Sequence, residues 1–389
     1  MIAALIRWSA RNVFLMSLVA VFVAAAGFYA VLRVPLDAIP DLSDTQVIVY
    51  TEFPGQAPQV VEDQVTYPLT TALLNVPKSR VVRGFSFFGV SFVYVIFQDG
   101  ADLYWARSRV LEYLNASSKR LPAGVTPTLG PDATGVGWVY QYVVRGAQKN
   151  LAELRSLQDW HLRYSLAKAE GVAEIASVGG FVRQYSVVID PRRLQALGIP
   201  LSKIRDAIRA SNMDVGGRTV ELAETEFAVR GRGYVKGIAD LEQIVVKNDR
   251  GAPVLLRDVA RIELTPDERR GITALNGEGE VVSGIVLQRF GENALTVIDS
   301  VKRRLAEIAG SLPAGVTVDA VYDRSELIRR AIDTLKVTLI EESAIVALVC
   351  VVFLLHVRSA LVVIVTLPLG VLIAYILMHV LGITSNIMS

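Results

Sequence analysis

Three long runs of hydrophobic residues interrupt a chain in which polar and apolar positions are otherwise mixed. The first run, residues 13–32, carries no charge, and at about 1.5 Å per helical residue it spans a hydrocarbon core about 30 Å thick. The second run, residues 337–357, is acidic near its start, and the third covers residues 361–381. Only a short link containing Arg358 separates these two. The pattern predicts three transmembrane helices, the last two joined as a tight hairpin.

Positive charges near the first run indicate its orientation. Arg7 and Arg11 precede it and Arg33 follows it, so the positive-inside rule places the N-terminus in the cytoplasm and residues 33–336 outside. The alternative for residues 1–32 is a cleaved signal peptide, with small residues at Ala24 to Ala26 for the peptidase. The run is longer than the roughly 7–15 residues of a signal core, which favours a transmembrane helix.

The long segment between the first and second runs shows strand and helix periodicity in turn. The predicted elements are a strand at 45–52, a helix at 57–74, strands at 80–86 and 91–97, and a helix at 102–121. Asp102 is a suitable N-cap for the last of these helices. The order β-α-β-β-α is typical of a split βαβ sandwich.

This order of elements recurs further along the chain. The second set consists of a strand at 140–144, a helix at 150–168, and strands at 172–178 and 184–189. The phrase Leu121-Pro-Ala-Gly-Val125 also returns as Leu312-Pro-Ala-Gly-Val316, in each case directly after a predicted helix. Five residues can recur by coincidence, but the same structural position favours a duplicated unit. A glycine-containing stretch from Leu194 to about Thr265 indicates an inserted subdomain.

Composition narrows the class of protein. Of the 389 residues, 52% are hydrophobic and 20% charged, which supports membrane segments. Lys plus Arg number 40 against 38 Asp plus Glu, so there is no basic footprint for nucleic acid. The single cysteine, Cys350, lies in an apolar run and offers no disulfide. Phosphate-binding loops, metalloprotease motifs and nucleophile elbows are absent from the sequence, so an enzyme is disfavoured.

Several motifs resemble one known family. They are Val34-Pro-Leu-Asp-Ala-Ile-Pro-Asp-Leu-Ser-Asp44, Tyr67-Pro-Leu-Thr70, Tyr104-Trp-Ala-Arg107, Gly130-Pro-Asp-Ala-Thr-Gly-Val-Gly-Trp138, Leu154-Arg-Ser-Leu-Gln-Asp-Trp160 and Val357-Arg-Ser-Ala-Leu361. Together they resemble the heavy-metal efflux branch of the resistance-nodulation-division (RND) permeases, the CusA/CzcA type. Leu42-Ser-Asp44 and Trp138 are more similar to the copper and silver pumps than to the zinc, cobalt and cadmium pumps.

The resemblance implies a fold that is membrane α-helical plus α+β, with three transmembrane helices, repeated split βαβ (ferredoxin-like) periplasmic subdomains and an inserted docking subdomain. The expected segments are 1–33 (cytoplasmic N-terminus and first transmembrane helix), 34–133 (first porter subdomain), 134–323 (second porter subdomain, with the docking subdomain at about 190–266), 324–336 (linker), 337–357 and 361–381 (second and third transmembrane helices) and 382–389 (a truncated periplasmic end).

The family's activity is also implied by resemblance. Its members form homotrimers in the bacterial inner membrane, join a periplasmic adaptor and an outer-membrane channel, and export metal ions in exchange for protons. No permanently bound cofactor is expected, since the metal ion is cargo and the proton gradient supplies the energy. The sequence resembles only the first third of the family, so Ile383 to Ser389 corresponds to a permease interior cut before the fourth helix.

Two residues are candidate metal contacts. Met388, in Asn386-Ile-Met-Ser389, matches a family position at which methionine steps the ion along, and thioethers suit Cu(I) and Ag(I). Its alternative is packing, because methionine fills gaps between helices readily. Glu268 stands where the copper and silver pattern has methionine, and an oxygen ligand suits harder ions such as Zn, Co or Cd. Its alternative is a surface carboxylate paired with Arg269 or Arg270.

The sequence leaves other readings open. The second and third runs carry no carboxylate away from their ends, so no proton relay is expected in this chain, and alone it should be unstable and should not pump. It could be a non-functional truncated product or half of a split permease. A drug-exporting permease is the remaining alternative, and it would be distinguished by an aromatic lining in the external cleft instead of thioethers.

Overall fold

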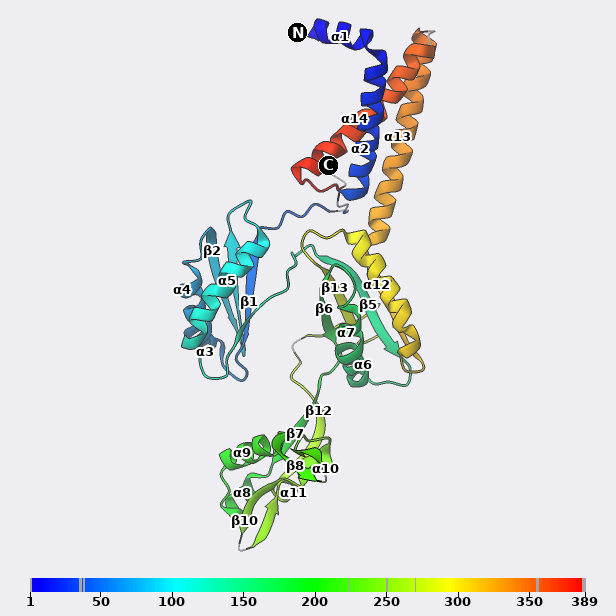
Figure 1. Cartoon of the computed structure of the whole chain (residues 1–389). Helices are drawn as coiled ribbons and strands as arrows, with labels where there is room; N and C mark the ends of the chain where they lie inside the picture. Colours follow the sequence, from blue (N-terminus) through cyan, green and yellow to red (C-terminus); the bar gives the residue numbers. More distant parts are fainter. Residues whose placement is uncertain are drawn as a thin grey trace. The chain divides into compact units, whose positions relative to one another are not determined.

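The computed structural model describes residues 2–34, 37, 39–222, 224–249, 251–269, 271–354 and 357–386. The chain divides into two compact units. The first consists of Met1–Gln148, Leu157–Val178 and Val282–Ser389, and the second of Lys149–Ser156 and Gly179–Val281. Among the described residues, the first unit holds two four-stranded sheets and the long helices, and the second holds three two-stranded ribbons (Figure 1).

The first sheet has the strand order β2-β3-β1-β4. Its subdomain consists of β1 (Gln46–Glu52), α3 (Pro58–Val61), η1 (Glu62–Thr66), α4 (Tyr67–Leu73), β2 (Ser79–Phe87), β3 (Val90–Phe97), α5 (Leu103–Ser117), η2 (Ser118–Arg120) and β4 (Pro127–Leu129). Strand β1 buries Val47 and Val49 with residues of the helices, because alternate side chains of a strand share one face. The Asp102 carboxylate caps α5 by accepting a hydrogen bond from the Trp105 N–H at 2.7 Å, as the sequence predicts.

The second sheet has the order β14-β5-β13-β6. Its elements are β5 (Trp138–Gly146), α6 (Leu151–Leu157), η3 (Gln158–Leu162), α7 (Arg163–Leu166), β6 (Val172–Gly179), β13 (Val282–Gln288), α12 (Ala294–Ile308), η4 (Ala309–Ser311) and β14 (Val316–Asp323). If the strands are numbered within each subdomain, the first sheet has the order 2-3-1-4 and the second has 4-1-3-2, which is the same order read in reverse. This is the strand order of a split βαβ sandwich.

The recurring Leu-Pro-Ala-Gly-Val phrases form the same turn in the two subdomains. Val125 N–H donates to the Pro122 carbonyl and Val316 N–H to the Pro313 carbonyl, each at 3.1 Å. The glycine of each phrase has a positive φ, +84° at Gly124 and +77° at Gly315, which a residue with a side chain adopts at a cost. A shared sequence thus encodes a shared turn, which is the physical basis of the repeat.

The subdomains differ in how their second and third strands are connected. Strands β2 and β3 are joined by the short turn at Phe88 and Gly89, whereas most of the chain between β6 and β13 belongs, with Lys149–Ser156, to the second unit. The strand predicted at 184–189 as part of the second repeat lies in this unit and pairs with Ala260–Pro266, so that assignment is wrong. The third strand of the second sheet is β13, which follows the insertion.

The second unit contains β7 (Arg183–Ile189), α8 (Pro191–Leu197), α9 (Leu201–Ser211), β8 (Val215–Leu222), β9 (Thr225–Gly231), α10 (Ile238–Glu242), β10 (Val245–Asp249), β11 (Ala252–Leu255), α11 (Leu256–Val259) and β12 (Ala260–Pro266). Its core includes Ile204, Leu241 and Leu256, so the insertion has an apolar core of its own.

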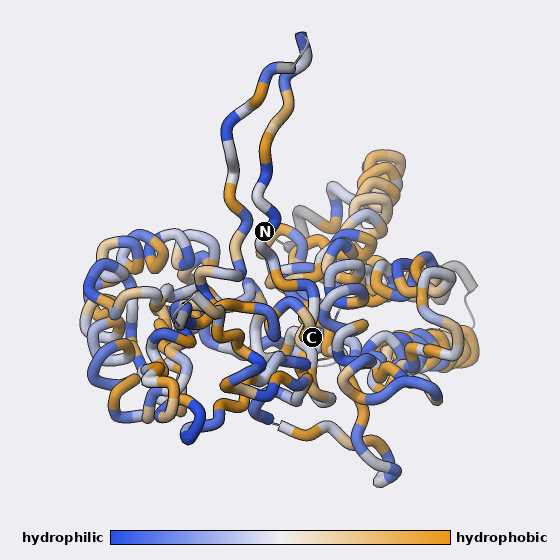
Figure 2. Tube along the Cα trace, turned by 90° about the horizontal axis from the view of Figure 1, so that it is seen from below, coloured by the Kyte–Doolittle hydropathy of each residue, from blue (hydrophilic) through white to orange (hydrophobic). Residues whose placement is uncertain are grey.

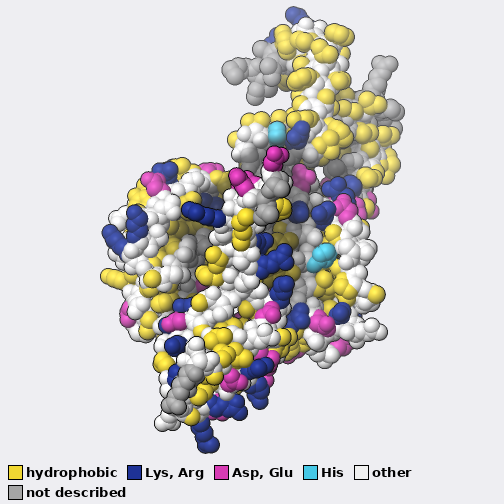
Figure 3. Space-filling model, turned by 60° about the horizontal axis from the view of Figure 1, so that its bottom comes forward, with side chains coloured by type: hydrophobic (Ala, Val, Ile, Leu, Met, Phe, Trp, Pro, Cys, Tyr) yellow, Lys and Arg dark blue, Asp and Glu magenta, His cyan; other side chains and the backbone are white. Residues whose placement is uncertain are grey.

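Four further helices complete the described chain: α1 (Ile2–Arg11), α2 (Val13–Arg33), α13 (Arg324–Leu354) and α14 (Val357–Leu381). In the part that the structure describes, two are long and apolar enough to cross a membrane, Val13–Arg33 and Ile364–Leu381. Figure 2 shows hydrophobic residues concentrated in such helical stretches, and in Figure 3 hydrophobic side chains cover the helical part while charges are spread over the remainder.

Helix α13 covers the expected linker at 324–336 and the expected second span as far as Leu354. The expected linker is therefore helical, continuous with the segment that was predicted to enter the membrane. Helix α13 is long enough to cross a membrane but is not among the apolar spans found in the described residues, and residues 355 and 356 lie outside them. Three membrane crossings stay a prediction.

Candidate functional site

The first predicted metal contact, Met388, lies outside the described residues. The second, Glu268, is exposed in the segment after β12, where its N–H donates to the Asp267 carboxylate at 2.8 Å. Its neighbour Arg269 forms an ion pair with Glu280 at 2.8 Å and stacks 4.5 Å from the centre of the Phe181 ring. Arg269 is therefore engaged by another carboxylate, and Arg270 lies outside the described residues. The metal role of both candidates stays a prediction.

Within the described ranges, no three His, Cys, Asp or Glu side chains are grouped closely enough to hold a metal ion. The His161 ring forms a hydrogen bond with the Ser311 hydroxyl at 3.0 Å. Met213 is half exposed in the inserted unit. The described part of the chain thus offers no assembled metal centre of carboxylates and imidazoles.

The two repeated subdomains are tied together at Asp132, in the connector between β4 and β5. Its carboxylate accepts a hydrogen bond from the Tyr104 hydroxyl at 3.3 Å and forms an ion pair with Arg289 at 3.0 Å, and its carbonyl accepts from the Phe290 N–H at 2.8 Å. Burial and the neighbouring Asp132 raise the pKa of the Tyr104 hydroxyl, which keeps it a donor.

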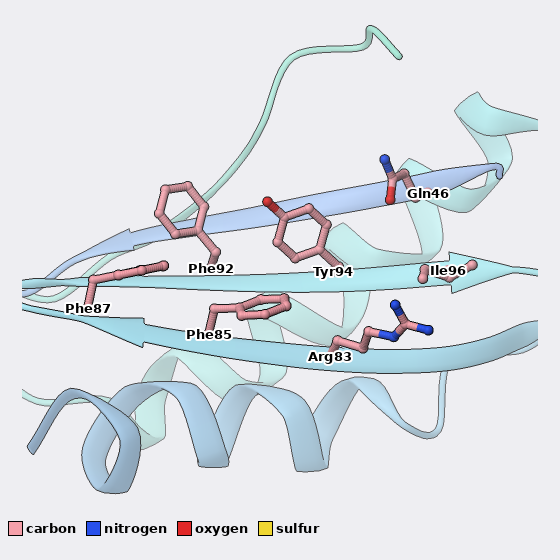
Figure 4. Close-up of a pocket in the computed structure, with 7 residues that line it drawn as sticks. All are labelled: Gln46, Arg83, Phe85, Phe87, Phe92, Tyr94 and Ile96. Carbon is pink, nitrogen blue, oxygen red and sulfur yellow. The ribbon is translucent and has the colours of Figure 1, made fainter. Parts of the chain in front are cut away.

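The open face of the first sheet is aromatic. A cavity of about 510 Å³ lies along β1, β2 and β3. Figure 4 shows the side chains that line it, which are Gln46, Arg83, Phe85, Phe87, Phe92, Tyr94 and Ile96. Phe85 and Tyr94 meet edge to face at 5.5 Å, and Phe87 and Phe92 at 6.0 Å. The strands predicted at 80–86 and 91–97 do not by themselves reveal this face. Its signal in the sequence is that aromatic residues occupy the alternate positions that would be polar in a solvated sheet.

Helices α2 and α14 pack closely at Gly27, where a Cβ would lie 2.5 Å from the Leu372 Cβ. Small residues permit such close approach of membrane helices. Two residues further along α2, Tyr29 contacts the His379 ring edge to face at 6.1 Å and lies under the Arg33 guanidinium at 5.4 Å. His379 therefore has a packing role in the described structure, consistent with its place near the end of an apolar run.

Asp323, the last residue of β14, gives the fold a pH dependence. It forms an ion pair with Lys302 and accepts a hydrogen bond from the Ser325 N–H at 2.9 Å. Burial acts to raise the pKa of Asp323, but the hydrogen bonds from Lys302 and Ser325 outweigh it and hold that pKa below its ordinary value. The folded protein thus favours the carboxylate, and this stabilisation is lost as pH falls from the unfolded pKa, about 3.9, through the lower folded one.

We expect Asp323→Asn to be less stable than the wild-type protein at neutral pH and to lose less stability on acidification below about pH 4. Thermal unfolding midpoints of the full-length protein, measured across this pH range, give the comparison. The control is Asp319→Asn on the same strand, since Asp319 pairs with Arg145 at 3.5 Å and both side chains are 48% exposed. Equal acid dependence for Asp323→Asn and the wild type would contradict the assignment.

The chain has close relatives among proteins of known function. Its sequence matches the profile of the AcrB/AcrD/AcrF family over residues 5–389. The cation efflux system protein CusA of Escherichia coli K12 is 55% identical over 100% of this chain and 37% of its own length. The putative cation efflux system protein SilA of Salmonella typhimurium is 54% identical, with the same coverage. The cobalt-zinc-cadmium resistance protein CzcA of Cupriavidus metallidurans is 36% identical over 96% of this chain and 36% of its own length.

A solved crystal structure of a heavy metal efflux pump (crystal form II) has a similar fold, with a TM-score of 0.88 and 35% identity over 98% of this chain and 38% of that one. The fold is therefore that of an RND permease. The chain belongs to the AcrB/AcrD/AcrF family, and the family inferred from the motifs is confirmed. It spans 37% of the length of the Escherichia coli relative.

Proposed function

We propose that this chain forms part of an inner-membrane permease that exports Cu(I) or Ag(I) in exchange for protons. The observation that carries the proposal is the difference in identity: 55% and 54% to CusA and SilA against 36% to CzcA, each over nearly the whole chain. Export of Zn, Co or Cd is the neighbouring possibility. Glu268 is the residue that would favour it, because carboxylate oxygens suit these ions better than Cu(I).

The proposed architecture has three membrane crossings, at α2, α13 and α14, with the repeated subdomains in the periplasm. We propose a homotrimer that joins a periplasmic adaptor and an outer-membrane channel. The β8–β9 hairpin supports a docking role for the inserted unit. Its strands are exposed over their described side chains, and Val215, Phe227 and Val229 are all at least half exposed. Apolar side chains on an isolated ribbon are typical of an interaction site.

The aromatic face of the first sheet favours a second candidate, export of an organic cation. An organic substrate gains affinity from aromatic walls, and a cation gains more from contact with ring faces. Arg83 in the same lining opposes this reading, because its positive charge repels a cation. We therefore propose metal export, and the experiment below also measures export of an organic cation.

The test is export by the full-length protein in a host that lacks its own copper and silver exporters. We expect tolerance to Ag⁺ to rise, tolerance to Zn²⁺ and to a lipophilic cationic dye to stay unchanged, and the 389-residue chain alone to confer nothing. Met388→Leu should lower Ag⁺ export at least about tenfold. Replacing a residue that only supports a metal ligand already lowers metal affinity or activity by about that factor. Met213→Leu is the matched control. Export of the dye without Ag⁺ would overturn the proposal.

A further inference from the structure

Two connecting segments of the first unit meet the start of α13 at one side chain, Arg324. Its Nη1 donates to the Asp37 carboxylate at 3.2 Å, and its Nη2 donates to the carbonyls of Val136 at 2.7 Å and Trp138 at 3.0 Å. Asp37 lies on the connector from α2 to the first sheet. Val136 and Trp138 end the connector between the two sheets. Arg324 itself is the first residue of α13, so one guanidinium joins the helices and both external subdomains.

The chemistry of this contact requires arginine. The Arg324 side chain is only 5% exposed and that of Asp37 is 24% exposed, so the charge is largely removed from water and depends on its partners. A guanidinium presents its donors in a planar fork and reaches several acceptors at once. A lysine ammonium could keep the ion pair with Asp37, but as a point charge on a flexible stem it would not hold the two carbonyls in the same way.

The start of α13 is fixed to the second sheet without a flexible linker. Asp323 ends β14 and is in register with Tyr140 of β5, and the next residue is already helical. Ser325 is fully buried, and its N–H donates to Asp323. The helix that follows has 31 residues and is therefore about 46 Å long. Because β14 ends at Asp323 and α13 begins at Arg324, a change in the direction of the helix at its first turn is passed to the end of the strand.

A further bond brings the end of α14 to the same place. The Asp37 N–H donates to the Ser385 carbonyl at 3.0 Å, and Ser385 is buried just after the helix ends. Asp37 and Arg324 together therefore gather the ends of α2, α13 and α14 beside the connector between the sheets. We define this set, Asp37, Val136, Trp138, Arg324 and Ser385, as the joint.

We propose that Arg324 is a positioning residue that transmits displacement of the membrane helices to the connector between the two external subdomains. The inference rests on the proposed function, because the displacement is that of an exporter cycle. A helix that shifts at the joint must carry the 136–138 backbone with it or break three hydrogen bonds of a buried charge. Because breaking these hydrogen bonds costs free energy, the helices and the connector between the subdomains are expected to move together.

The first experiment compares full-length Arg324→Lys with the wild-type protein. We expect Ag⁺ export per molecule to fall about tenfold while bound Ag⁺ stays close to that of the control variant. The thermal midpoint should fall only slightly below that of the control, because the Val136 and Trp138 carbonyls lose their donor but the ion pair with Asp37 is kept. The matched control is Arg329→Lys, because Arg329 lies further along the same helix and pairs with Asp299 at 3.1 Å, with half-exposed side chains. Export at the wild-type rate would overturn the proposal, as would loss of export together with Ag⁺ binding and thermal stability.

The second experiment needs no transport. Spin labels attached at Asp99→Cys on the first subdomain and Asp333→Cys on α13, in a background without other thiols, report the distance across the joint; both positions are well exposed. We expect a narrow distance distribution that broadens in Arg324→Lys and stays narrow in Arg329→Lys. An unchanged distance distribution in Arg324→Lys would refute the proposed role of Arg324 even if the wild-type protein exports metal. A wild-type protein that exports no Ag⁺ would refute the proposed function and leave this comparison valid.

Discussion

Gly179→Ala is expected to lower the free energy of unfolding by about 2–5 kcal/mol. Gly179 ends β6 with φ +75°, a backbone conformation that costs a residue with a Cβ about 1–2 kcal/mol. The added Cβ would also lie 2.3 Å from the Val281 carbonyl oxygen and 2.8 Å from the Thr273 Cβ. Neither neighbour is a flexible side-chain end, and Val281 N–H is bonded to the Thr273 carbonyl at 2.9 Å, so overpacking adds about 1–3 kcal/mol.

The matched control for Gly179 is Gly198→Ala. Gly198 has φ +60° at the end of α8, and a Cβ there would meet no atom within 4 Å. It should therefore show the conformational cost alone. Thermal unfolding of the two full-length variants separates the two contributions, and equal midpoints would show that the crowding around Gly179 relaxes at no cost.

Gln158→Leu is expected to destabilise the protein by about 2–4 kcal/mol, through hydroxyls left without partners. Gln158 is fully buried in the π-helical turn η3, accepts a hydrogen bond from the Tyr142 hydroxyl at 3.0 Å and donates to Ser177 at 3.2 Å. Burial raises the pKa of the Tyr142 hydroxyl, which therefore stays a donor. The Tyr142 ring lies against Gly284, where a Cβ would approach it to 2.2 Å, so the ring has little room to turn away.

A double-mutant cycle tests this account of Gln158. Tyr142→Phe combined with Gln158→Leu should cost less than the two single changes added together, because neither buried partner of that bond is then left unpaired. Gln59→Leu is the control, since Gln59 is exposed and bonds Asp63 at 3.2 Å. Additive effects in the cycle, or a Gln158→Leu variant as stable as the control, would show that the buried bond contributes little.

The repeat could be anticipated because it is encoded locally. The Leu-Pro-Ala-Gly-Val phrase places a glycine where the turn needs positive φ, and Asp102 precedes its helix as a cap, so each signal lies within a few residues of its effect. The long apolar runs at 13–32 and 361–381 likewise correspond to helices α2 and α14. The motif resemblance to the heavy-metal branch was specific enough to give the family, which the comparisons confirm.

The candidate sites are harder to predict from the sequence than the fold. Arg324 falls in a segment expected to be a linker, and nothing near it in the sequence indicates that Asp37, 287 positions away, completes its environment. The aromatic face of β2 and β3 is not apparent from strand periodicity, because that period indicates which positions are buried and not what an exposed face does. Met388 and Glu268 rest on motif positions, and their ligand roles stay predictions.

The sequence by itself determined the local elements, the duplication, the membrane-compatible helices and the family, because propensity, turn chemistry and hydrophobic period act over a few residues. The tertiary structure alone decided that β14 continues into α13 without a linker and that the insertion occupies the position of the β2–β3 turn. It also decided that one buried arginine joins two connectors to the start of α13. These features depend on contacts between residues far apart in the chain, and the low-dielectric surroundings that make an ion pair essential exist only once those residues have packed together.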